Sequence, residues 1–261
     1  MASNEGNLSS KELLEAQSHV WHDMFGFMRS FSIKYAIELG IPDAVHNHGK
    51  AVSLTDLVAA LSIPPCRIPN FRHLMGLFVH NDYFKRTDED IYSLTPNSRV
   101  LVRDKGASIT PFFQMILHQP LLEPWQLLPA WFKCKQRATA FMMCHGPPLW
   151  KATSTMPELR KMMIEGLDSD YVVIAKVIVE DCADQFQGVK SLVAGNTGKI
   201  ALAIAKAFPY IKCAMLELAY VINALEKSDV IKYVAGDMFK HIPPADVLIL
   251  KVKWRMHVGV S

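Results

Sequence analysis

The sequence lacks the features that mark a disulfide-bonded, secreted or membrane protein. Its five cysteines are odd in number, widely spaced and without a C-x-x-C pair, which predicts reduced thiols and neither a disulfide framework nor a metal site. Residues 1–12 are polar and contain no apolar core of a secretory signal. No uncharged apolar run approaches the roughly 20 residues of a membrane span. These absences together predict a cytoplasmic protein with no membrane partner.

A strong charge of either sign is also missing. The 28 basic and 25 acidic residues leave a net charge of +3, which is too weak to indicate a nucleic-acid or membrane-surface partner. Half of the residues are hydrophobic and a fifth are charged, as is typical of globular proteins with a core. The 261 residues allow one large domain or two smaller ones.

A long helix is predicted near the N-terminus. Ser9 and Glu12 have the spacing of a capping box, and Gly40 supplies the stop. The apolar residues between them cover much of the helix girth, so one partner surface is not enough to bury them. We expect a second subunit to cover part of this helix, and an internal core helix is the alternative.

Two shorter helices and a hairpin follow. The helices are expected over residues 57–61 and 69–78, and the polar turn 87–90 joins strands 83–86 and 91–94. Three helices before a hairpin predict a winged helix. Such a domain often binds DNA, but the third helix has few basic residues to neutralise phosphates. A dimerisation or substrate-lid role for residues 1–105 therefore fits better.

Residues 106–261 are predicted to form a second domain. Residues 108–184 read as helical and rich in Met, Phe and Trp, which suits an apolar small-molecule pocket, although a plain hydrophobic core is the alternative. After residue 191 strands alternate with a helix, which predicts βαβ units and a parallel, Rossmann-like sheet. The chain ends about ten residues after the start of the fourth strand. We therefore expect an incomplete α/β domain.

Candidate site residues follow the ends of these strands. Gly195 and Gly198 lie in the turn before a helix, where backbone can approach an anionic ligand. Glu217 ends the next strand, where a carboxylate can accept hydrogen bonds from a ribose diol. Asp237 and Met238 follow the third strand and can face an adenine ring. A NAD-dependent dehydrogenase is the alternative from βαβ units alone, but there is no G-x-G-x-x-G.

Several ordered segments carry a resemblance to a family. The chain resembles the plant S-adenosylmethionine-dependent O-methyltransferases that act on phenolics, especially the isoflavone and resveratrol type. The resemblance runs nearly end to end. Its segments are Ile37-Glu38-Leu39-Gly40-Ile41, Val45-His46-Asn47-His48-Gly49, Tyr92-Ser93-Leu94-Thr95-Pro96, Ala205-Lys206-Ala207-Phe208-Pro209, Gly236-Asp237-Met238-Phe239 and Ile242-Pro243-Pro244-Ala245-Asp246.

The resemblance implies a winged-helix dimerisation region, a homodimer, and a Rossmann-like domain that methylates a flavonoid- or stilbene-like phenol. It implies that His257 is the base that removes the phenol proton, with no metal involved. The implied S-adenosylmethionine ligands are Gly195, Gly198, Glu217, Asp237, Met238 and Lys251.

The sequence departs from the family pattern at four places. The glycine segment lacks two residues, including the strand-end Asp, and two of its glycines are replaced. Glu217 stands in place of an Asp. His257 lies two residues late and lacks the following Asp-Trp, so Arg255 falls in the base position when no gap is allowed. The chain ends at Ser261, before the family's remaining strands. A catalytically inactive, truncated relative that acts only as a dimerisation partner is therefore the alternative function.

Overall fold

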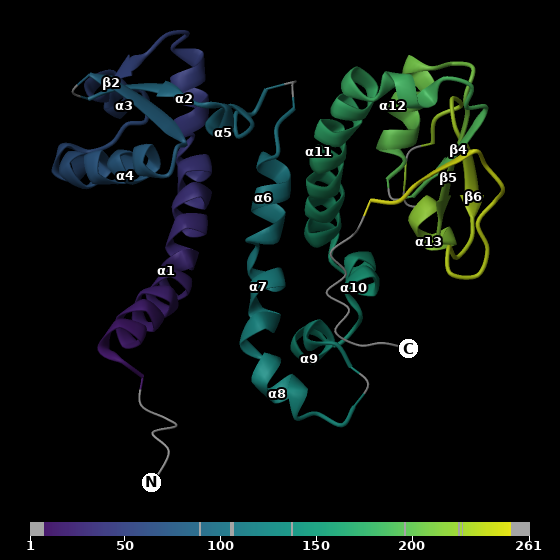
Figure 1. Ribbon diagram of the computed structural model, residues 1–261, viewed down its shortest axis with the longest axis horizontal. Coiled ribbons are helices and arrows are strands. Elements are labelled where there is room, and N and C mark those ends of the chain that lie inside the picture. Colours follow the sequence, from purple (N-terminus) through teal and green to yellow (C-terminus); the bar gives the residue numbers. More distant parts are fainter. Residues whose placement is uncertain are drawn as a thin grey trace. The chain divides into compact units, whose positions relative to one another are not determined.

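The chain divides into two compact units, Met1–Val102 and Arg103–Ser261. The structure is a computed structural model that describes residues 8–88, 90–104, 107–136, 138–195, 197–223, 225 and 227–251, and Figure 1 shows the arrangement of elements within each unit. Among these residues no helix combines the length and apolar character that crossing a membrane requires. The predicted domain boundary between residues 105 and 106, with the roles given to the two domains, stays a prediction.

The first unit begins with the long helix α1, Ser10–Leu39. The hydroxyl of Ser9 accepts a hydrogen bond from the backbone N–H of Glu12 at 3.3 Å, and the Glu12 carboxylate accepts one from the N–H of Ser9 at 2.8 Å. This is the predicted capping box. Gly40 ends the helix at φ +77°, where a side chain would be strained. Both helix ends are therefore set by local sequence.

The rest of the first unit confirms the predicted winged helix. Strands β1, β3 and β2 form an antiparallel sheet in that order, and the β2–β3 pair is the predicted hairpin. Met75 and Phe78 of helix α4, Ile68–His80, pack with Phe84 and Tyr92 of the hairpin in one buried cluster. The sequence missed α2, β1, η1 and α5, which are all short. The elements are α2 Ile41–Asn47, β1 Val52–Ser53, α3 Leu54–Ala60, η1 Pro65–Arg67, α4 Ile68–His80, β2 Phe84–Asp88, β3 Ile91–Leu94 and α5 Pro96–Arg99.

The second unit starts with the predicted helical segment. Met115 of α6 packs with Leu159 and Met163 of α11 in a small buried core. The two helices approach closely at Gly166, where an added Cβ would lie 2.7 Å from the sulfur of Met115. The elements are α6 Thr110–Ile116, α7 Gln119–Gln126, α8 Leu128–Phe132, α9 Ala140–His145, α10 Leu149–Thr155, α11 Pro157–Asp181 and η2 Ala183–Phe186.

A four-stranded parallel sheet completes the second unit and confirms the predicted Rossmann-like class. The strands lie in the order β6-β5-β4-β7. Side chains of α11 and α12 pack with strand residues in the largest buried cluster of this unit. The elements are β4 Ser191–Ala194, α12 Lys199–Ala207, β5 Lys212–Glu217, α13 Ala219–Ile222, β6 Lys232–Ala235 and β7 Val247–Ile249.

One carboxylate joins two strands where they begin. Asp246, just before β7, accepts hydrogen bonds from the backbone N–H groups of Lys190 and Ser191 at 2.9 Å and from the Ser191 hydroxyl at 3.0 Å. The backbone N–H of Asp246 donates to that hydroxyl at 3.0 Å. The N–H of Lys190 and the other donors to this carboxylate lower the pKa of Asp246.

Candidate functional site

The predicted site residues follow the carboxyl ends of the four parallel strands. The strands are paired in register, with Ala194 opposite Met215 and Ile249, and Glu217 opposite Ala235. Their ends therefore meet at one edge of the sheet, where ligands of open α/β sheets bind. Gly195 follows β4, Glu217 ends β5, Asp237 and Met238 follow β6, and Lys251 follows β7.

Gly195 and Glu217 lie side by side at this edge. A Cβ added to Gly195 would be 3.6 Å from the Glu217 Oε1 and 3.6 Å from the carbonyl oxygen of Leu216. The other carboxylate oxygen of Glu217 accepts from the N–H of Leu218 at 3.3 Å. The absent side chain of Gly195 thus leaves space next to a carboxylate, and a ligand with hydroxyl groups can use that space.

Gly198 has a different local role. It is the N-cap of α12 with φ +77°, and an added Cβ would lie 3.0 Å from the sulfur of Met215 and 3.2 Å from Cδ1 of Ile231. Glycine at this position therefore allows the turn to pack on β5 and on the residue before β6. A direct role of Gly198 in cofactor binding stays a prediction.

Lys251 reaches α11. Its ammonium group pairs with the carboxylate of Asp170 and lies 4.1 Å from the ring centroid of Tyr171. Burial raises the pKa of the Tyr171 hydroxyl, and the carboxylates of Asp170, Glu217 and Asp168 raise it further. Tyr171 therefore stays protonated and marks the place where α11 meets the strand ends.

Two buried polar atoms have no hydrogen-bond partner among the described residues. They are Oδ1 of Asp168, on α11, and the hydroxyl oxygen of Thr197, just before α12. The other carboxylate oxygen of Asp168 pairs with the Lys199 ammonium at 3.4 Å. Because buried polar groups are nearly always hydrogen-bonded, these two atoms are candidates to contact a bound ligand.

Asp237 and Met238 lie in a turn that is tied to β5 through backbone. The N–H of Gly236 donates to the Glu217 carbonyl oxygen at 3.0 Å. The Asp237 carboxylate accepts from the N–H of Phe239 at 3.0 Å, and Met238 is 41% exposed. These contacts place the turn at the site edge, and the Met238 thioether is free to pack on a ligand.

His257, the predicted base, lies outside the described residues, as does Asn196 of the rewritten glycine turn. The sequence reasoning also missed residues on α11 that the structure brings to this edge: Asp168, Asp170 and Tyr171. Two acidic residues within an amphipathic helix were the available signal. Their pairing with Lys199 and Lys251 depends on long-range packing, which local patterns do not show.

Two hollows on the surface do not coincide with this edge. One, of about 400 Å³, is lined in the first unit by Leu54, Ile68, Arg72 and their neighbours. The other, of about 530 Å³, lies along α11 and α12. Neither is lined by Gly195, Glu217 or Lys251, although Lys199, the partner of Asp168, lines the second. The site is therefore defined by the strand ends and their side chains.

The fold is similar to that of solved methyltransferases. A methyltransferase in calicheamicin biosynthesis, in its SAH-bound form, has a TM-score of 0.70 and 17% identity, with 94% of this chain and 72% of that chain covered. Human N-acetylserotonin methyltransferase in complex with SAM has a TM-score of 0.64 and 17% identity, with 95% and 71% covered. At this identity the likeness supports the fold alone.

Sequence relatives extend the comparison to plants. Trans-resveratrol di-O-methyltransferase of Vitis vinifera is 40% identical over 256 residues, which cover 95% of this chain and 71% of the relative. Eugenol O-methyltransferase of Ocimum basilicum is 35% identical over 252 residues, covering 94% and 71%. Family models for an O-methyltransferase domain and an O-methyltransferase dimerisation domain match residues 125–257 and 21–104. As its sequence segments predict, the chain belongs to the plant O-methyltransferase family.

Proposed function

We propose that this protein transfers the methyl group of S-adenosylmethionine to a hydroxyl of a phenolic, flavonoid- or stilbene-like molecule. One observation carries this proposal: Gly195 and the Glu217 carboxylate adjoin at the carboxyl edge of the sheet in an O-methyltransferase chain. Glu217 accepts hydrogen bonds from the ribose diol of the cofactor there. Two similar structures contain SAM or its product, which supports the choice of cofactor.

Charge at the edge supports a cationic ligand. Asp168, Asp170 and Glu217 bring three carboxylates, whereas Lys199 and Lys251 bring two ammonium groups. S-adenosylmethionine carries a sulfonium and an ammonium cation beside one carboxylate, so its net charge is complementary to the site. We assign the unpaired Oδ1 of Asp168 to the cofactor ammonium, and the Thr197 hydroxyl to its carboxylate.

The remaining predicted ligands take the other parts of the cofactor. Lys251 has three N–H donors, so it can bind the cofactor while it pairs with Asp170. Asp237 is assigned to the adenine amino edge, and the exposed Met238 thioether to the adenine face. Gly195 and Gly198 let the turn approach the cofactor. None of these assignments requires a metal ion.

The reaction needs a base near the acceptor hydroxyl. We assign this role to His257: its imidazole takes the phenol proton, the phenolate oxygen bonds to the methyl carbon, and the carbon–sulfur bond breaks to leave S-adenosylhomocysteine. The resemblance to the family carries this assignment. Removing the imidazole should therefore reduce turnover and leave cofactor binding unchanged.

The helical segment supports a flat, apolar acceptor. Met115 and Met163 form its buried core, and Phe112 and Phe141 pack against them. Methionine adapts its shape to aromatic rings, which suits a phenol. The names of two relatives, trans-resveratrol and eugenol O-methyltransferases, specify phenols as acceptors of those proteins.

The first unit is proposed to form a homodimer through α1. Large apolar side chains on this helix are 49–59% exposed within the chain, and a dimerisation-domain model matches residues 21–104. A second copy would bury this stripe. These side chains are Val20, Trp21, Met24, Phe25, Phe27 and Met28. The cytoplasmic location predicted from the cysteine pattern stays a prediction.

Calorimetric titration with S-adenosylhomocysteine tests the cofactor proposal, and methyl transfer to resveratrol or eugenol tests the reaction. We expect saturable binding and a methylated phenol, with His257→Ala lowering turnover by about 10²- to 10⁴-fold at unchanged affinity. The exposed His80→Ala in the first unit is the matched control. No binding at millimolar ligand would overturn the proposal.

The alternative of a non-catalytic dimerisation partner rests on the exposed apolar stripe of α1. It predicts a stable dimer by light scattering together with no methyl transfer. A dimer that also turns over phenols excludes this alternative. A strict monomer that does not associate with a full-length relative excludes it as well.

A further inference from the structure

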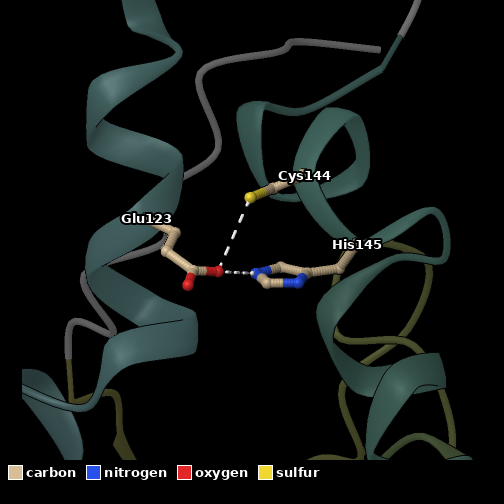
Figure 2. A group of neighbouring side chains, drawn as sticks. All are labelled: Glu123, Cys144 and His145. Carbon is tan, nitrogen blue, oxygen red and sulfur yellow. Dashed lines mark hydrogen bonds and ion pairs between the residues drawn. The ribbon is translucent and has the colours of Figure 1, made fainter.

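A second group of chemically reactive side chains lies in the helical segment, apart from the strand ends. Glu123 of α7 faces Cys144 and His145, the last two residues of α9 (Figure 2). The Glu123 Oε2 is 3.8 Å from the Nε2 of His145 and 3.9 Å from the Cys144 sulfur. All three ligand atoms lie within 4.8 Å of one another, and all three residues are half-buried.

We propose that Glu123, Cys144 and His145 bind a Zn²⁺ ion. In a tetrahedral zinc site with bonds of about 2.0–2.3 Å, neighbouring ligand atoms are roughly 3.3–3.6 Å apart. The separations of 3.8 and 3.9 Å exceed these edges by only a few tenths of an ångström. The third edge, between the Cys144 sulfur and the His145 imidazole, is at most 4.8 Å, so a rotation of the imidazole that shortens it closes one face of the tetrahedron around an ion.

The donor set selects the metal. A thiolate, an imidazole and a carboxylate are the three ligand types that Zn²⁺ takes in proteins. Mg²⁺ and Ca²⁺ prefer oxygen ligands only, so they do not match a site with sulfur and nitrogen. Three protein ligands leave the fourth position for water or another ligand.

Two contacts hold the imidazole in place. The Nε2 of His145 is 2.9 Å from the Pro120 carbonyl oxygen, and the ring lies 4.4 Å from the ring centroid of Phe141. A zinc ion about 2.0 Å from Nε2 does not fit between two atoms that are 2.9 Å apart, so binding breaks the hydrogen bond to Pro120 and turns the imidazole away from that carbonyl oxygen. Loss of that bond lowers the affinity, so we expect weaker binding than at a closed four-ligand zinc site.

A bound ion would connect α7 to α9, because Glu123 lies on α7 and the adjacent Cys144 and His145 lie on α9. This arrangement also explains why the sequence showed no zinc signal. Zinc motifs of the C-x-x-C type place two ligands on one tight turn, which this site does not do. The proposed ion is independent of the methyl-transfer proposal, since it uses none of the strand-end residues.

Cobalt titration of the metal-free full chain tests the site. Co²⁺ bound by a thiolate gives a charge-transfer absorption in the near ultraviolet, and added Zn²⁺ should abolish it by competition. We expect Cys144→Ser to remove this band, and Glu123→Gln and His145→Gln each to weaken Zn²⁺ binding more than about tenfold. Cys134→Ser, a half-buried cysteine of the same helical segment, is the matched control and should leave the band intact.

Circular dichroism of each variant checks that the helices form. Zn²⁺ should also raise the melting temperature of the wild-type chain by more than it raises that of Glu123→Gln. Absence of the thiolate band in the wild-type chain overturns the proposal, and so does a band that survives Cys144→Ser. If Cys144→Ser does not fold, an unchanged Zn²⁺ affinity in Glu123→Gln overturns the proposal instead.

Discussion

The two edges of the parallel sheet both hold carboxylates, and they use them differently. At the amino edge, Asp246 accepts three hydrogen bonds from Lys190 and Ser191. At the carboxyl edge, Asp168 has one paired oxygen and one buried oxygen without a described partner. The hydrogen bonds to Asp246 contribute to stability, whereas a buried carboxylate oxygen without a protein partner is available to a ligand. The comparison predicts that replacing Asp246 at the amino edge changes stability, whereas replacing the Glu217 carboxylate at the carboxyl edge changes binding.

Glu217→Ala gives the strongest test of the carboxyl edge. Loss of two hydrogen bonds between the carboxylate and the ribose diol should weaken S-adenosylhomocysteine binding by about 100-fold. The melting temperature of the ligand-free chain should change little. Calorimetric titration measures the affinity, and Glu180→Ala, an exposed carboxylate of α11 that pairs with Lys176, is the control. Equal losses in the two variants would contradict a specific role for Glu217.

Gly198→Ala tests the packing of the turn before α12 on Met215 at the carboxyl edge, through its effect on stability. A side chain at φ +77° is strained, and its Cβ would meet Met215 at 3.0 Å. We expect a loss of about 1–3 kcal/mol in the free energy of unfolding, measured by urea denaturation. Gly188→Ala has nearly the same φ, +78°, but open space around the Cβ, so it reports strain alone. A smaller loss in Gly198→Ala than in Gly188→Ala would exclude the packing argument.

Gly195 and Gly198 show what sequence patterns do and do not reveal. Local signals predicted the ends of α1 at Ser9 and Gly40, the hairpin and the parallel sheet. They also placed Gly195 and Glu217 at one edge, because parallel strands end together. Sequence patterns did not show that Gly198 packs on Met215, because the contact is between the turn before α12 and strand β5 and depends on the fold.

The acidic residues of α11 were missed for the same reason. Asp168 and Asp170 acquire a role only when α11 packs beside the sheet and brings them to Lys199 and Lys251. The Glu123–Cys144–His145 cluster likewise depends on the packing of α7 against α9. The sequence thus predicted the strand-end part of the candidate site, and tertiary packing supplies the helix side.

Gly195→Ala sharpens the comparison of the glycines. Its Cβ would sit at an ordinary contact distance of 3.6 Å from Glu217, so the fold should tolerate it. The added methyl group fills space that we assign to the cofactor. We expect about tenfold weaker S-adenosylhomocysteine binding, roughly 1.4 kcal/mol, at unchanged stability. A stability loss as large as that of Gly198→Ala would place Gly195 in the packing role instead.

Asp246→Asn has the smallest expected effect and tests the amino edge. Hydrogen bonds lower the pKa of Asp246 in the folded chain, so the ionised group stabilises the fold above its unfolded pKa of about 3.9. That stabilisation disappears as the pH falls through the lower, folded pKa. The neutral amide accepts more weakly, so the variant should melt at a slightly lower temperature near neutral pH.

The pH dependence of the difference in melting temperature between the wild-type chain and Asp246→Asn shows whether the ionised carboxylate stabilises the fold. Calorimetric melting of both chains should show a gap that is constant at neutral pH and closes on acidification below about pH 4. S-adenosylhomocysteine affinity near neutral pH should be the same in both chains, because Asp246 lies at the opposite ends of the strands from Glu217. A gap that widens in acid would contradict the lowered pKa. A loss of affinity would show that the two edges are coupled, and the separation of stability from binding would then fail.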